Sequence, residues 1–443
     1  MTGKQYPILA RTVALMMIML VSGRRSFAYS VLTHEEIVDL EWTSELQPLL
    51  LQRFSGLTQD QLREAHSYAY GGSVIQDLGY YPFGNKEFSD LAHYVRSGDF
   101  VLELIYQSQN ADEYAFALGA LSHYAADVYG HPAVNEAVAI HYPKLRAKYG
   151  MSVRFAQDES AHLKTEFGFD TLQVAKNRYA SEKYHDFIGF HVAQPLLERA
   201  FAIVYGMPLK DVLPHQELAI GSYRYSVSRL IPQMTKVALQ MHKKDLMRET
   251  PNFAKKKFLY RLSRSDYERE WGKTYSKPGF GTRLLSALLR FLPKVGPFKG
   301  LGFNNPTPQT ENLYIRSINT TVDRYSALLE EVRTGTLVLP NFNLDDGTRT
   351  MAAEYTLADE TYARLLITLA SQKFDGTSPQ LRNNILAFYS DPSLPIETKD
   401  DPARWQSVLD DLSELKSFSR TSSMNGRSPG SYCVSERSLA CQR

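Results

Sequence analysis

The chain has 443 residues, of which 43% are hydrophobic and 22% are charged. This is the composition of an ordinary globular protein, and the length allows two domains or one elaborate helical domain. A formal net charge of +2 excludes an overall electrostatic signature of nucleic-acid or membrane binding, so any such signal has to be local.

Residues 1–28 have the pattern of a secretory signal peptide. Lys4 and Arg11 flank a polar start, residues 13–21 form an apolar run too short to span a bilayer comfortably, and residues 26–28 resemble a cleavage site. Cleavage after residue 28 makes Tyr29 the mature N-terminus, with a free α-amino group that could bind a metal. The sequence therefore predicts a secreted or periplasmic protein.

Two features near the chain ends leave alternatives open. Arg24 and Arg25 lie between the apolar run and the cleavage site, so cleavage after Gly23, or retention as an anchor, stays open. No other segment has the length of a transmembrane helix. Cys433 and Cys441 are the only cysteines; in a secreted protein they could pair across a short terminal loop, but they are too late and too few to form a metal site.

Two helices are predicted before residue 75. The first spans residues 33–51, with Thr33 as N-cap, and the second begins at Thr58 and continues to residue 70. Gly71 and the two residues after it end the second helix. Asp77 then lies in a loop, free to point inward, and the next helix carries His93.

The central predicted element is a helix of small and apolar residues over 115–126. His123 and Asp127 lie one turn apart on one face, whereas His131 lies roughly 12 Å from His123 along the axis. A single ion could hardly bind all three. The Gly and Pro on either side of His131 predict that the helix ends there. The arrangement suggests adjacent metal sites on a buried helix.

A second pair with the same spacing is formed by His162 and Glu166, which share one face if this segment is helical. The remaining histidines singled out, His66, His141, His185 and His191, are interpreted as surface or packing residues. His141 is the substitute ligand if His162 is misassigned.

The second half of the chain carries no motif that we can place. Residues 243–299 contain fifteen Lys and Arg against five Asp and Glu, including a short basic amphipathic helix near 283–292. That helix suits an anionic membrane surface, although burial against the first half is the favoured interpretation. Further helices are expected over 313–332, 355–372 and 402–415, with a short extended segment at 334–338 and a flexible tail over 417–443.

The candidate ligands offer only nitrogen and oxygen, which suits zinc in a secreted hydrolase better than copper, iron or calcium. In chain order they are the Tyr29 amino terminus, His34, Asp77, His93, His123, Asp127, His131, His162 and Glu166. This order resembles the zinc-dependent phospholipase C family, which shares its fold with fungal single-strand-specific zinc nucleases and with the catalytic part of glycosylphosphatidylinositol phospholipase D. The resemblance covers roughly residues 29–200 and is strongest over 33–37, 71–77 and 123–131.

The resemblance implies an all-α fold and three zinc ions. One ion would be bound by Asp77, His93, His123 and Asp127; a second by Asp127, His34 and the backbone of Tyr29; the third by His131, His162 and Glu166. Asp127 would bridge two ions, and Asp77 would orient or deprotonate the attacking water. The family usually has Trp where this chain has Tyr29.

The expected organisation is a signal peptide at 1–28, a phospholipase C-like catalytic domain at 29–225, a mostly helical C-terminal region of unknown role at 226–416, and the tail. The favoured function is hydrolysis of phospholipid headgroups or another phosphodiester, with peripheral membrane contact as an option. A zinc-dependent single-strand nuclease and a noncatalytic zinc-binding secreted protein stay open as alternatives. Nucleic acid is the less favoured partner, and the sequence does not define the oligomeric state.

Overall fold

The computed structural model describes residues 31–175, 189–227, 231, 234–235 and 302–418. This part of the chain is all-α apart from one two-stranded hairpin, as predicted. Several predictions lie outside the described residues: the signal peptide, Tyr29, His185, the basic segment at 243–299 and the two cysteines. Among the described helices, none is long and apolar enough to cross a membrane.

The first part of the structure consists of helices of very different length. They are α2 (Val31–Glu41), the π-helix η1 (Trp42–Leu46), α3 (Gln47–Arg53), α4 (Gln59–Gly72), the 3₁₀ helix η2 (Ile75–Tyr80), α5 (Lys86–Tyr94), α6 (Ser97–Gln107), α7 (Ala111–His141), α8 (Pro143–Tyr149), η3 (Phe155–Gln157), α9 (Glu159–Ala175), α11 (Gln194–Tyr205), α12 (Leu209–Val212) and α13 (Gln216–Tyr225).

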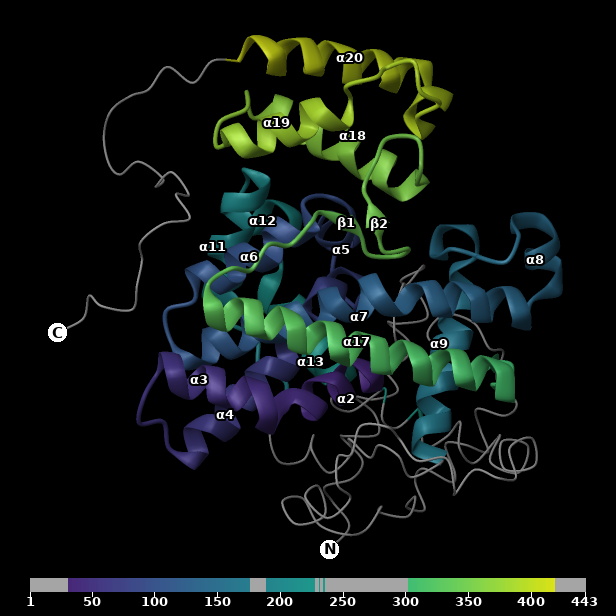
Figure 1. Cartoon of the computed structure of the whole chain (residues 1–443). Helices are drawn as coiled ribbons and strands as arrows, with labels where there is room; N and C mark the ends of the chain where they lie inside the picture. Colours follow the sequence, from purple (N-terminus) through teal and green to yellow (C-terminus); the bar gives the residue numbers. More distant parts are fainter. Residues whose placement is uncertain (1–30, 176–188, 228–230, 232–233, 236–301, 419–443) are drawn as a thin grey trace, which may run out of the picture.

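The C-terminal part adds α17 (Pro308–Thr334), α18 (Thr356–Ser371), α19 (Pro379–Phe388), η7 (Glu397–Asp400) and α20 (Pro402–Ser417). Between α17 and α18, strands β1 (Phe342–Asn343) and β2 (Thr348–Arg349) form an antiparallel hairpin. Figure 1 shows this hairpin between the C-terminal helices and α7.

Helix α7 is the element around which the others pack. Asn110 caps its N-terminus by accepting a hydrogen bond from the backbone N–H of Glu113. Helices α4, α6, α9 and α17 all contact α7, and α17 runs alongside it in Figure 1. One buried hydrophobic cluster extends from Val31 in α2 to Leu415 in α20. The predicted domain boundary at residue 225 stays a prediction, but the two parts share this core.

Two glycines let α4 and α7 approach closely. A Cβ on Gly119 of α7 would lie 2.0 Å from the carbonyl oxygen of Ala69, and one on Gly72 of α4 would lie 1.9 Å from that of Phe116. Any side chain at either position would therefore force the helices apart. The close approach also brings Ser73, at the end of α4, against α7, where its carbonyl accepts a hydrogen bond from His123.

The predicted end of the central helix beside His131 is wrong. Helix α7 continues through Pro132 to His141. Pro132 has no N–H to donate to the carbonyl of Val128, one turn earlier. Buried residues beyond the proline, such as Val134 and Val138, supply packing that outweighs this local defect. As a consequence His123, Asp127 and His131 project from one continuous helix.

Three further local predictions are wrong. Thr33 lies inside α2, and its hydroxyl donates to Asp170 instead of capping the helix. Asp77 lies in η2 and not in an irregular loop. Residues 334–338 form no strand. In contrast, Thr58 is confirmed as the N-cap of α4, where it forms a capping box with Gln61.

Substituting Gly119→Ala should destabilise the protein by about 1–3 kcal/mol, because the added methyl group overpacks a backbone contact that cannot yield. Denaturant unfolding measures the loss. Gly221→Ala in α13 is the matched control, since nothing lies within 4 Å of its Cβ position and alanine should stabilise that helix by about 0.5–1 kcal/mol. Equal effects of the two substitutions would contradict the close packing.

Candidate metal centre

Five elements bring the predicted donors into one buried cluster. His34 comes from α2, Asp77 from η2, His93 from the last turn of α5, His123, Asp127 and His131 from α7, and His162 and Glu166 from α9. Each of these side chains is at most 1% exposed. The ninth predicted donor, Tyr29, lies outside the described residues.

Asp127 lies at the centre of the cluster, and its two oxygens face different imidazoles. Oδ2 is 3.0 Å from Nε2 of His123 and 3.5 Å from Nε2 of His93. Oδ1 is 3.8 Å from Nε2 of His34 and 3.9 Å from Nε2 of His131. A carboxylate placed in this way can contribute one oxygen to each of two cations, which is the role of a bridging ligand.

Asp77, in η2, joins the same group. Its Oδ1 lies 3.4 Å from Nε2 of His93. Two triples of donor atoms fall within 4.8 Å of one another, namely His34, Asp77 and His123, and His93, His123 and Asp127. His34 also stacks on the ring of His123, with the ring centroids 4.4 Å apart. His34, which the resemblance assigns to the second ion, thus lies against His123 and Asp77, which it assigns to the first.

Contacts behind the imidazoles fix which ring nitrogen faces the cluster. Because a carbonyl oxygen can only accept, each ring nitrogen that contacts one must carry the proton. Three rings donate in this way: His93 to Ser89 (2.8 Å), His123 to Ser73 (2.9 Å) and His162 to Val153 (2.6 Å). When such a ring is neutral, its other nitrogen carries the lone pair and faces the cluster, as in a metal-binding histidine.

Several of the buried donor atoms have no hydrogen-bond partner of acceptable geometry within the described ranges. They are both oxygens of Asp77, Asp127 and Glu166, Nε2 of His93 and His123, and Nδ1 of His162. Buried polar atoms are almost always paired, because leaving one unpaired costs about 1–3 kcal/mol. A cluster of unpaired lone pairs that face one another fits divalent cations, and the mixture of nitrogen and carboxylate donors fits zinc.

Burial and neighbouring charges shift the pKa values of several donors in opposite directions, so no protonation state suits all of these buried groups at once. Burial lowers the pKa of His162 to about 3, so this imidazole is neutral. Burial, followed by the charges of Asp77 and Asp127, raises the pKa of Glu166 well above its usual value. Burial alone would lower the pKa of His93, but the neighbouring carboxylates of Asp127 and Asp77 raise it well above its usual value. Bound divalent cations would take the place of these protons.

The donors predicted for the third ion are less tightly gathered. Nδ1 of His162 lies 3.4 Å from Oε1 of Glu166, one turn along α9. His131, Glu166 and His162 do not form a triple within 4.8 Å, in contrast to the two groups above. The assignment of each donor to an individual ion therefore stays a prediction.

Three of the histidines set aside in the sequence have other contacts. His66 lies 3.0 Å from Asp39 and stacks on the ring of Trp42. His141 lies 3.0 Å from the hydroxyl of Thr310, and His191 contacts the ring of Tyr68. None of the three belongs to the donor triples.

One residue in the cluster was not identified from the sequence. Asp345, in the turn of the β hairpin, places Oδ1 3.9 Å from Nδ1 of His131. It is far from the other donors in the sequence, and no other donor lies three or four residues away from it on a helix. The only signal was the turn sequence Asp345-Asp346-Gly347, which predicts a tight turn but no ligand.

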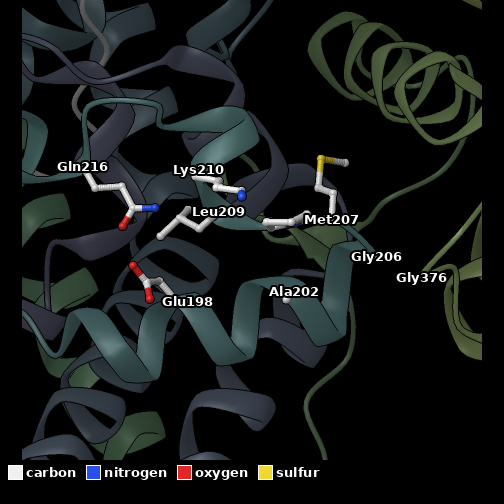
Figure 2. Close-up of a pocket in the computed structure, with 9 residues that line it drawn as sticks. Glu198, Ala202, Gly206, Met207, Leu209, Lys210, Gln216 and Gly376 are labelled. Carbon is white, nitrogen blue, oxygen red and sulfur yellow. The ribbon is translucent and has the colours of Figure 1, made fainter. Parts of the chain in front are cut away.

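A separate hollow of about 360 Å³ lies at the end of α11, beside α12 and the start of α13. Figure 2 shows Glu198, Met207, Lys210 and Gln216 around it. Its lining includes none of the donors described above, so the buried cluster remains the candidate active site.

Comparison with known proteins agrees with this geometry. Residues 33–213 match the family model described as zinc dependent phospholipase C. No curated protein and no solved structure matches the chain. The matched range begins just before His34, ends beyond Glu166 and contains all the predicted donors that the structure describes. Residues 33–213 therefore form a domain of the zinc-dependent phospholipase C family.

Proposed function

We propose that the protein is a secreted zinc-dependent phosphodiesterase that hydrolyses phospholipid headgroups at a trinuclear zinc centre. The observation that carries the proposal is the buried Asp127 carboxylate, whose two oxygens face separate pairs of imidazoles. The family assignment supports zinc and phospholipase C chemistry. Secretion and the number of ions rest on the sequence pattern.

The residues of the cluster divide the work of phosphodiester hydrolysis. When bound, zinc supplies Lewis-acid stabilisation of the phosphoryl oxygens and makes water available as a nucleophile near neutral pH. Asp127 would serve as a ligand to two of these cations. Asp77 has both oxygens buried and without a partner among the described residues, so one of them can orient a water molecule and accept its proton.

The donor set argues against a purely structural zinc site. Structural sites are usually closed by four ligands and rich in cysteine. The predicted donors include three carboxylates and no cysteine, and the two oxygens of one of them, Asp127, face separate pairs of imidazoles. Such carboxylate-rich, multinuclear arrangements are typical of hydrolytic centres.

Removal of zinc should destabilise the protein. A ligand at one hundred times its Kd stabilises the folded state by about 2.7 kcal/mol. For a chain of 443 residues, removing one such ion with an excess of a strong chelator should lower Tm by roughly 3 °C, and removing several ions should lower it further. Thermal unfolding with and without the chelator measures the change. Adding Zn²⁺ back should restore Tm, and Mg²⁺, which prefers oxygen ligands, should not. An unchanged Tm would contradict a zinc centre.

Substituting Asp127→Asn should remove more than one zinc ion per chain and reduce headgroup release by about 10³-fold, since Lewis-acid stabilisation is worth several kcal/mol. Elemental analysis and a phospholipid assay measure the two effects. Glu113→Gln is the matched control, because Glu113 is a largely buried carboxylate on the same helix that pairs with Arg199.

The same preparations should be assayed on single-stranded DNA. Wild-type protein that releases headgroups and leaves DNA intact supports the proposal, whereas preferential hydrolysis of DNA would assign the centre to a nuclease. An Asp127→Asn protein that keeps its zinc and its activity would rule out the bridging role.

A further inference from the structure

The β hairpin brings a carboxylate into the metal centre from beyond the family domain. Asp345 lies between β1 and β2, well past residue 213, where the family match ends. It is nevertheless 3% exposed and lies beside His131, one of the predicted ligands. None of the predicted roles of the centre uses this residue.

The backbone of the hairpin is attached to the same helices that carry the donors. The N–H of Leu344 donates to the carbonyl of His93 (3.2 Å), and the amide of Asn135 in α7 donates to the carbonyl of Asp345 (3.1 Å). The N–H of Asp345 donates to the side chain of Asn343 (3.0 Å). The position of Asp345 is therefore defined relative to α5 and α7.

Two tyrosines orient the carboxylate. Oδ2 of Asp345 accepts hydrogen bonds from the hydroxyl groups of Tyr94 (2.8 Å) and Tyr355. Tyr355 is in turn fixed by the N–H of Ala156, which donates to its hydroxyl oxygen (3.1 Å). With Oδ2 occupied in this way, Oδ1 is the oxygen that faces His131.

The contact of Asp345 with His131 is as long as the contacts between facing donors, and it involves Nδ1 of His131, whereas Asp127 faces Nε2 of the same ring. Asp345 can therefore share an ion with His131 if that imidazole binds through Nδ1. Supporting hydrogen bonds from the imidazoles to carbonyl groups are 2.6–2.9 Å long. Pairs of donors that face one another across the cluster are 3.0–3.9 Å apart. Oδ1 of Asp345 and Nδ1 of His131 are 3.9 Å apart. With zinc–ligand bonds of about 2.0–2.2 Å, two atoms bound to one ion lie no more than about 4.4 Å apart.

We propose that Asp345 is a further ligand of the third zinc ion, together with His131, His162 and Glu166. This rests on the zinc centre proposed above and adds a ligand that the family domain alone lacks. Within the described residues, the oxygens of Glu166 and Nδ1 of His162 have no hydrogen-bond partner. These buried atoms, which are predicted ligands of the third ion, could be paired by a cation. The C-terminal region thus completes the centre.

The test measures zinc and stability in four proteins: wild type, Asp345→Asn, Asp346→Asn and Tyr355→Phe. Asp345→Asn keeps the shape and a hydrogen-bond acceptor but loses the charge. We expect it to bind one zinc fewer per chain after dialysis against a weak chelator, and to show a smaller rise in Tm when zinc is added. Asp346→Asn is the neighbouring control, since Asp346 faces Arg154 and the N–H of Thr348 and should retain all the zinc.

Tyr355→Phe separates ligation from support of the hairpin. It removes one hydrogen bond to Oδ2 and leaves Oδ1 in place, so the zinc content should equal that of wild type even if Tm falls. If Asp345→Asn fails to fold, Asp345→Glu replaces it: the displaced carboxylate should release one zinc faster than wild type, and release at the wild-type rate would overturn the proposal.

The outcomes distinguish this inference from the proposed function. Wild-type protein without zinc or headgroup release would overturn the proposed function itself. Wild-type protein with zinc and activity, but an Asp345→Asn variant with the full zinc content, would overturn only the ligand role of Asp345. Retention of all ions with about 10–100-fold weaker affinity would make Asp345 a positioning residue behind His131, which also contradicts the proposal.

Discussion

The structure depends on a carboxylate that the protein cannot satisfy by itself. Asp127 is fully buried among four imidazoles, and its oxygens lack hydrogen bonds of good geometry within the described ranges. Burying charge in this way costs several kcal/mol unless a partner compensates. The surrounding helices nevertheless converge on this point, through glycine contacts between α4 and α7 and carbonyl groups that orient the rings. Such a costly arrangement is understandable if cations occupy it.

The sequence predicted the helical class and the donors with regular spacing, because helix geometry translates spacing directly into proximity. His123 and Asp127, and likewise His162 and Glu166, lie one turn apart on their helices as expected. The sequence wrongly predicted that the helix ends at Pro132, because buried residues before and after the proline keep it helical. A local signal cannot weigh the tertiary contacts that a long central helix makes.

The order of the donors along the chain follows from the sequence, but the sequence could not predict how donors from separate helices lie relative to one another in space. That His34, Asp77 and His93 meet His123 depends on how α2, η2 and α5 pack on α7, and this is decided by contacts such as the approach at Gly119. The resemblance to a family supplied what spacing could not. The resemblance could not identify Asp345, because this residue belongs neither to the family motif nor to a periodic pattern.

Pro132 connects the two parts of the protein. Because it has no N–H, the carbonyl of Val128 is left without its helical partner, and Gly347 of the hairpin packs against it: a Cβ on Gly347, whose φ is +70°, would lie 2.2 Å from that oxygen. Only glycine fits such a backbone approach at positive φ. With Gly347 held there, Asp345, two residues earlier, lies beside His131, the residue that precedes the proline. The proline that suggested the end of a helix thus provides the surface on which the C-terminal hairpin reaches the metal centre.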